Sequence, residues 1–290
     1  MKSNKFPDML QLPGVRHVEL APACFAVEVT TDRFQATIAL QGGQLITFTP
    51  TDGEALLYLS PTAIFEPGVP VRGGIPVCWP WFGPHPDDTT APAHGVARNR
   101  DWALTSIDRH DEQFHVKLAG PRHDGLSVEI SYLLSERGVT CSLSTHNESP
   151  RPQTLSAALH SYLAISSAAA VEISGMGNCR YDDKVLHARA IAEPAPLRID
   201  REIDRVYYTA TPVTVADAGW QRQITVSNSG SGSCVVWNPW LARSRSIADL
   251  PDDAWNHFVC VEAANALDDS QTLAPGETHT LKTQIEIAAR

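Results

Sequence analysis

Apolar and polar residues alternate along most of the chain, in short runs separated by turn residues. The period of two is clearest after Trp102, where Phe114, Val116 and Leu118 mark one face of a predicted strand. Two further runs repeat the pattern, and polar turns such as His123-Asp124-Gly125 join neighbouring runs. This pattern predicts a meander of antiparallel strands with one buried face.

The remaining predicted strands share this alternation or are rich in β-branched and aromatic residues. They cover 24–29, 34–39, 45–49, 171–174, 184–188, 205–209, 223–226, 234–237, 257–262 and 278–287. The run from Gln153 to Ile165 is more continuously apolar, as expected for a strand covered on both faces or for a buried helix. We favour the strand because alternation resumes at Val171 and no capping residue precedes the run.

Many short strands with turn signals every ~8–12 residues predict an all-β fold, either a large antiparallel β-sandwich or a barrel. The length of 290 residues allows one large β domain or two smaller ones. No long polar linker interrupts the chain, and the nearest thing to a boundary, Glu193-Pro194-Ala195-Pro196, fits a loop. We therefore expect a single domain over residues 1–290.

Charge and composition narrow the possible partners. The chain has 23 basic and 33 acidic residues, a net charge of −10, which argues against nucleic acid or an anionic membrane as partner. The first 15 residues lack an apolar signal region, and no apolar run approaches the ~20 residues of a membrane helix. Six scattered cysteines contain no CxxC pair, so we expect reduced, mostly buried thiols. A monomer in the cytoplasm is the expected form.

The stretch 71–102 gathers residue types that a purely structural loop rarely needs together. Arg72 precedes the pair Gly73-Gly74, whose missing Cβ atoms permit positive φ and close backbone approach. Further along, His94 and Arg98 return an imidazole and a guanidinium, and a guanidinium forks well onto a carboxylate or phosphate. The structural alternative is a packed connection, and four prolines that stiffen a segment with three aromatic side chains fit either interpretation: Pro76, Pro80, Pro84, Pro86, Trp79, Trp81 and Phe82.

Two ionisable residues occupy otherwise apolar predicted strands. His160 lies in ALHSYL, where a core histidine with one hydrogen bond is the commoner explanation. Glu262 lies in FVCVEAA, and a buried carboxylate needs either a partner or a wet pocket. A structural salt bridge remains open for Glu262, but apolar surroundings raise a carboxyl pKa toward the range of a general base at neutral pH.

The motifs RGGIPVCWPWFG and PAHGVAR resemble the signature of the hexose-6-phosphate mutarotases, a branch of the aldose 1-epimerase family. LHSYL is similar to the family's catalytic-histidine strand and CVEAAN to its catalytic-glutamate strand. The resemblance covers nearly the whole chain and implies the galactose-mutarotase-like β-supersandwich. It implies that His160 and Glu262 interconvert the α and β anomers of a hexose 6-phosphate by acid–base ring opening and closure. Glucose 6-phosphate is the first choice of substrate, and no cofactor or metal is expected.

The same resemblance implies four residues that bind the substrate, a small sugar phosphate. Arg72 and Arg98 would hold the 6-phosphate or nearby hydroxyls, Asp204 would accept hydrogen bonds from sugar hydroxyls, and His94 would donate a further one. From the sequence alone, Asp204 is more simply a turn residue. Val96 departs from the family, whose members often carry an aromatic there, which leaves the substrate preference open.

Three other interpretations remain. A mutarotase of unphosphorylated aldoses would use the same chemistry, and a carbohydrate-binding β-sandwich would use none. Trp237, in WNPW, packs near a sugar or, more simply, fills the core. A metal site among the 11 histidines is poorly supported because no HxH or HxxxH spacing stands beside a carboxylate.

Overall fold

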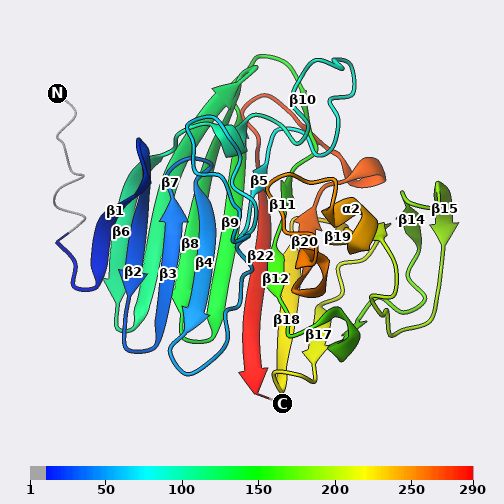
Figure 1. Cartoon of the computed structure of the whole chain (residues 1–290). Helices are drawn as coiled ribbons and strands as arrows, with labels where there is room; N and C mark the ends of the chain where they lie inside the picture. The colour runs from blue at the N-terminus through cyan, green and yellow to red at the C-terminus, as the bar shows by residue number, and fades with distance from the viewer. Residues whose placement is uncertain (1–10, 290) are drawn as a thin grey trace.

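Two layers of antiparallel strands make up the structure, a computed structural model that describes residues 11–289 (Figure 1). One layer is a single eight-stranded sheet, called the long sheet. In spatial order it contains β13 (Val171–Ser174), β17 (Val213–Asp217), β18 (Arg222–Ser229), β22 (Thr278–Ala289), β9 (Gly138–Asn147), β8 (Leu126–Ser135), β7 (Gln113–His123) and β6 (Ala103–His110).

The other layer consists of two sheets that cover different parts of the long sheet (Figure 1). The first is β1 (Val15–Ala21), β2 (Cys24–Thr30), β3 (Phe34–Ala39) and β4 (Gln44–Pro50). The second, called the site sheet, is β15 (Ala188–Ile191), β14 (Tyr181–Asp183), β16 (Ile203–Tyr207), β19 (Ser233–Asn238), β20 (Phe258–Ala264), β11 (Ala158–Leu159) and β5 (Val77–Cys78), with β12 (Tyr162–Ala164) also paired to β20.

Short elements connect these sheets. They are the pair β10 (Gln153–Leu155) and β21 (Gln271–Leu273), the helix α2 (Trp240–Ser244), and the 3-10 turns Ala97–Asn99, Ala168–Ala170, Ala254–Asn256 and Leu267–Asp269.

The core lies between the two layers. Phe34 and Phe48 stack with ring centroids 5.3 Å apart, and Phe34 meets Phe114 of the long sheet edge-on at 6.5 Å. The Tyr132 hydroxyl donates across the layers to the Gly43 carbonyl at 2.7 Å, so its burial leaves no polar atom unsatisfied. One cluster of buried apolar side chains runs through both layers, and each large member contributes about 1.5–3 kcal/mol when fully buried.

The predicted all-β sandwich is confirmed, and most predicted strands are present within a residue or two of their expected ends. Several strands were not predicted from the sequence, among them β1, β6 and β17. The side chains of β1 are mostly exposed or half-exposed, so the apolar alternation there is weak. All six cysteines are free, and all but Cys179 are buried, as expected.

Two predicted strands were wrong in detail. The run 153–165 is neither one strand nor a helix, because the chain turns between β11 and β12, where the Ser161 amide donates to the Leu159 carbonyl at 3.0 Å. The segment 184–188 is mainly the turn that joins β14 to β15. His187 there has φ +52°, and the Leu186 amide donates to an Asp183 carboxylate oxygen at 2.9 Å.

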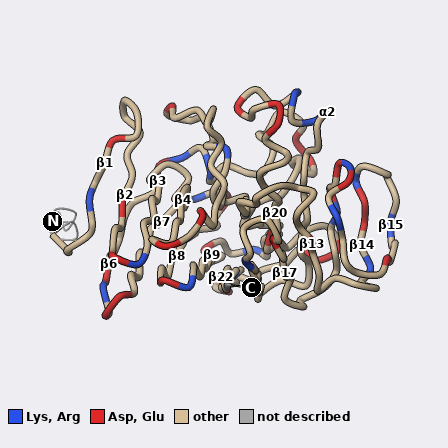
Figure 2. Tube along the Cα trace, turned by 60° about the horizontal axis from the view of Figure 1, so that its bottom comes forward, with Lys and Arg blue, Asp and Glu red and all other residues tan. Residues whose placement is uncertain are grey.

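Charged residues of both signs are interspersed along the strands and loops (Figure 2). Within residues 11–289, none of the helices combines the length and the apolar character that crossing a membrane requires.

The segment that contains His94 and Arg98 is fixed to the end of β5 by its backbone. The Val96 amide donates to the Trp79 carbonyl at 2.8 Å, and Gly95 adopts φ +77° beside it. A Cβ atom at Gly95 would lie 2.0 Å from the Trp79 carbonyl oxygen, which no side chain can tolerate without a backbone shift.

We predict that Gly95→Ala destabilises the protein more than Gly68→Ala. Both glycines have positive φ, +77° and +85°, but a Cβ at Gly68 meets nothing within 4 Å. Gly68→Ala should therefore cost about 1–2 kcal/mol for the left-handed backbone alone. Gly95→Ala should cost about 1–3 kcal/mol more, because the overpacked segment must shift. Urea unfolding measures both, and equal costs would contradict the close contact.

Candidate active site

The register of β20 against its neighbours brings two ionisable side chains face to face. β11 and β12 both pair with β20 in one unbroken register, although the chain turns between them. Leu159 lies opposite Ala263, so the next residue, His160, lies opposite Glu262. The Nε2 atom of His160 is 3.4 Å from Oε1 of Glu262. Strand pairing therefore builds this contact from residues about a hundred positions apart.

Glu262 is buried and His160 is 13% exposed, and both side chains lack the partners that a structural role would supply. Glu262 is 1% exposed, and among the described residues neither of its carboxylate oxygens has a hydrogen-bond partner. The Nδ1 atom of His160 is equally unpartnered, and the 3.4 Å contact with Glu262 lacks the alignment of a hydrogen bond. Leaving such groups unsatisfied is costly, which is typical of a site that a ligand completes.

Burial acts on the two pKa values in opposite directions. It raises the pKa of Glu262 well above its ordinary value of 4.5, because an ionised carboxylate loses its hydration there. It lowers the pKa of His160 well below 6.5, and the nearby His94 and Arg72 lower it further. Both shifts favour the neutral forms, a protonated carboxyl group and an uncharged imidazole.

The six residues singled out in the sequence come together. They line a single cavity of about 560 Å³ on the outer face of the site sheet, which they reach from loops and from several strands: Arg72, His94, Arg98, His160, Asp204 and Glu262.

Arg72 is held in place on two sides. Its Nε donates to Oδ1 of Asp249 at 3.2 Å, and its NH1 donates to the Tyr162 hydroxyl at 3.2 Å. The expectation of positive φ at the following glycines is correct, with +115° at Gly73 and +64° at Gly74. These contacts orient the guanidinium while leaving other N–H groups for an anion.

His94 and Arg98 line the same cavity. The Nδ1 atom of His94 accepts a hydrogen bond from the Gly83 amide at 3.3 Å, so Nε2 carries the proton and can donate. Burial, with Arg98 adding to it, lowers the pKa of His94 to about 3, so this imidazole is neutral at physiological pH. Arg98 itself donates through NH2 to the Ala93 carbonyl at 2.8 Å.

Asp204 lies on a strand, not in the turn that its sequence suggests. The alternation of β16 points Asp204 toward the cavity and Arg205 to the other face of the sheet. There Asp204 meets Nζ of Lys184 at 3.3 Å. Lys184 was missed in the sequence because the residues around it resembled a strand, whereas they form a turn that overhangs the cavity.

Three other polar lining residues were also not predicted from the sequence: Tyr162, Arg243 and Glu202. Trp237 was expected either to pack near a sugar or, more simply, to fill the core, and its position fits both. It lines the cavity with its ring centroid 5.7 Å from that of His160, and it packs against an apolar cluster on the same face. A signal in sequence was available only for Tyr162, which is adjacent to the histidine motif.

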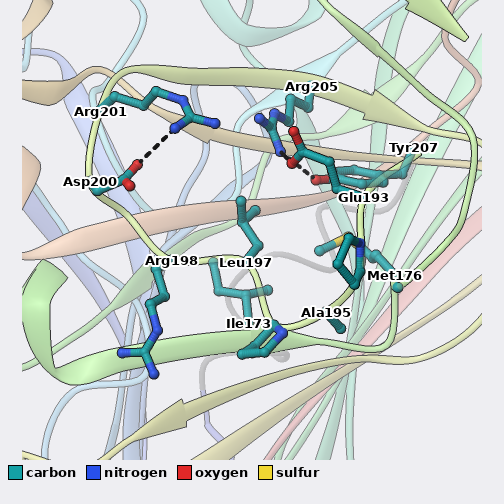
Figure 3. A pocket seen from close by; sticks show the side chains of 13 residues that line it. Ile173, Met176, Glu193, Ala195, Leu197, Arg198, Asp200, Arg201, Arg205 and Tyr207 are labelled. Atoms are coloured by element: carbon teal, nitrogen blue, oxygen red, sulfur yellow. Dashed lines mark hydrogen bonds and ion pairs between the residues drawn. The ribbon is translucent and has the colours of Figure 1, made fainter. Parts of the chain in front are cut away.

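A second cavity, of about 240 Å³, lies on the other face of β16 (Figure 3). Arg205 is 1% exposed there and contacts Asp183 and Glu193 at 3.0 Å and the Tyr207 hydroxyl at 3.2 Å. Two carboxylates therefore already balance its charge, and none of the residues expected from the sequence lies in this cavity. These ion pairs anchor β16 from behind Asp204, although Nη2 of Arg205 has no hydrogen-bond partner among the described residues.

Comparison with known proteins agrees with this geometry. The sequence profile described as aldose 1-epimerase matches residues 26–286. The chain belongs to the aldose 1-epimerase family. Within the family, it is 33% identical over 284 residues to a protein of Escherichia coli (strain K12) named as a candidate glucose-6-phosphate 1-epimerase, covering 91% of this chain and 90% of that protein.

Solved structures extend the aldose 1-epimerase assignment to the fold. A candidate mutarotase from Salmonella typhimurium superposes with a TM-score of 0.87 at 29% identity, over 97% of this chain and 95% of that one. A galactose mutarotase-like protein from Clostridium acetobutylicum has a TM-score of 0.75 at 14% identity, over 95% and 98% of the two chains. The galactose-mutarotase-like fold expected from the motifs is confirmed.

We predict that Glu262→Gln stabilises the protein at neutral pH. Because the folded-state pKa of Glu262 is raised, the unfolded chain loses its proton first as pH rises above about 4.5, and the wild type loses stability from there upward. Glutamine does not ionise, so the variant should gain about 0.5–2 kcal/mol at pH 7 and little at pH 4.

Urea unfolding at both pH values measures this gain. Glu129→Gln, at an exposed position of β8, is the matched control and should change the free energy of unfolding by less than about 0.5 kcal/mol. A loss of stability in Glu262→Gln at pH 7 would mean that the carboxylate is structurally required.

Proposed function

We propose that this protein interconverts the α and β anomers of a hexose 6-phosphate, with glucose 6-phosphate as the first candidate. One observation carries the proposal: His160 and Glu262 lie 3.4 Å apart in a cavity that also presents Arg72 and Arg98. The family assignment and the name of the Escherichia coli relative support the same substrate.

The reaction needs one acid and one base that exchange roles. A base takes the proton from the O1 hydroxyl while an acid protonates the ring oxygen O5, and the C1–O5 bond breaks to give the aldehyde. Rotation about C1–C2 presents the other face of the carbonyl, and closure returns both protons. His160 and Glu262 share one proton, so the pair can give a proton to one oxygen and accept one from the other.

A phosphate on C6 would adjust the pair for this task. Arg72 and Arg98 are among the charges that lower the pKa of His160 in the ligand-free cavity. A bound phosphate carries about −1.5 to −2 charges at pH 7 and offsets both guanidinium groups. The pKa of His160 then rises toward its ordinary value, and the shared proton moves toward the imidazole, next to a neighbouring O5.

The two alternatives fit less well. An unphosphorylated aldose would leave Arg72 and Arg98 without an anion to neutralise. A carbohydrate-binding protein without catalysis gains nothing from a carboxyl group and an imidazole that are buried without partners.

We predict that His160→Gln and Glu262→Gln each lower kcat by about 10²–10⁴-fold, because each variant removes one of the two proton carriers. Polarimetry of freshly dissolved α-glucose 6-phosphate measures the rate above that of the spontaneous reaction. At equilibrium, NMR exchange between the anomeric signals measures the same rate. Arg201→Ala, which alters the second cavity, is the control and should keep the wild-type rate. If the wild-type protein does not raise the rate above that in buffer alone, the proposed mutarotase activity is refuted.

We predict that Arg72→Ala and Arg98→Ala lower kcat/KM for glucose 6-phosphate by about 10–150-fold each, the value of a hydrogen bond to a charged group. Activity on glucose should change much less, because glucose has no phosphate group for the arginines to bind. The ratio of the two substrates separates this effect from general damage. Equal losses on both sugars would argue for the unphosphorylated substrate.

Three expectations stay predictions: the single domain, the monomer and the cytoplasmic location. The continuous core through both layers supports a single domain over residues 11–289, and residues 1–10 and 290 lie outside the described residues.

A further inference from the structure

A sulfur ligand lies beside the His160–Glu262 pair. Cys260 precedes Glu262 by two residues on β20, so both side chains point to the same face of the sheet. One ligand atom each from His160, Cys260 and Glu262 lie within 4.8 Å of one another. His160 lies in the turn between β11 and β12, and the pairing of both strands with β20 fixes its distance from Cys260 and Glu262.

We propose that His160, Cys260 and Glu262 form a binding site for a soft divalent cation such as Zn²⁺ or Cd²⁺, and that the bound ion blocks the cavity. A thiolate, an imidazole and a carboxylate are the ligand types that Zn²⁺ uses, and the thiolate selects soft ions over Mg²⁺ or Ca²⁺. The site is inhibitory, because the ion takes the two groups that the proposed reaction needs.

The spacing of the ligand atoms suits a tetrahedral ion. Bonds of about 2.0–2.3 Å place tetrahedral ligand atoms about 3.3–3.8 Å apart. The His160–Glu262 contact of 3.4 Å already lies in this range. The separations to the Cys260 sulfur, at most 4.8 Å, require a side-chain adjustment of about an ångström. His160 and Glu262 line the cavity, whereas Cys260 is fully buried, so an ion bound to all three would lie at the wall of the cavity.

The charge balance also favours a thiolate-requiring ion. The carboxylate oxygens of Glu262 have no hydrogen-bond partner among the described residues, so a cation would satisfy them. Binding releases the thiol proton of Cys260 and the proton of Glu262 to solvent, and the two anions formed neutralise the two charges of the ion. Arg72 and Arg98 repel cations, so only an ion that gains binding energy from the sulfur is expected to bind at this site.

Titration of the full chain with CdCl₂ tests the site directly. The thiolate-to-cadmium charge-transfer absorbance in the ultraviolet should saturate at one ion per chain, and EDTA should reverse it. Cys260→Ser should abolish the band. Cys78→Ser should keep it, because Cys78 is also fully buried in the site sheet but belongs to no such cluster among the described residues.

A second variant keeps the test decisive if Cys260→Ser does not fold. Glu262→Gln retains the thiol and removes one ligand, so its affinity for Cd²⁺ should fall at least about tenfold. MgCl₂ at the same concentrations should leave the absorbance unchanged. A band that persists in Cys260→Ser, or that disappears in Cys78→Ser, would overturn the proposal, as would unchanged affinity in Glu262→Gln.

Metal binding is read without any sugar, so it does not depend on the proposed function. Inhibition does depend on it: Cd²⁺ should slow mutarotation in the wild type and in Cys78→Ser over the same concentrations that produce the band. A band without any mutarotase activity would refute the function and leave the site. Activity that survives full occupancy would refute the inhibition.

Discussion

The pairing of β20 is the constraint on which the site depends. All seven residues of this strand are buried, with β19 on one side and β11 and β12 on the other. A strand covered on both faces has no freedom to slip, because a shift by one residue would exchange the two faces. Glu262 is therefore held in a buried position by the backbone of its neighbours, at a cost that the surrounding core offsets. The raised carboxyl pKa follows mainly from this burial, and the nearby Asp204 raises it further.

Alternation in the sequence predicted most of the strands and the layered fold, since each strand buries one face in the core. It could not predict the turn at His160, because residues on both sides of the turn are equally apolar. At this turn the His160 amide donates to the Pro76 carbonyl at 3.0 Å, next to the pairing of β11 with β5. Such a long-range contact leaves no local pattern.

The candidate site was predictable only where its residues belong to motifs. His160 and Glu262 stood out as ionisable residues in apolar runs, and the motifs around them and around Arg72 and Arg98 indicated their roles. Lys184 had no such support, since it reaches the cavity from a turn whose composition resembled a strand. The sequence around Asp204 was misleading, because an aspartate in a polar stretch is also typical of a turn. Only the place of Asp204 in the site sheet reveals the direction of its side chain.

The charge distribution has a consequence for how a ligand arrives. The chain carries a net charge of −10, yet Arg72, Arg98, Lys184 and Arg243 line the cavity. A doubly charged sugar phosphate therefore meets repulsion at long range and attraction only within the last few ångströms. Dissolved salt screens the distant field more than the partly buried contacts, since the Debye length is about 8 Å at physiological ionic strength. The net charge of the whole surface therefore lowers the association rate of such a ligand. Its dissociation rate depends instead on the four basic side chains that line the cavity.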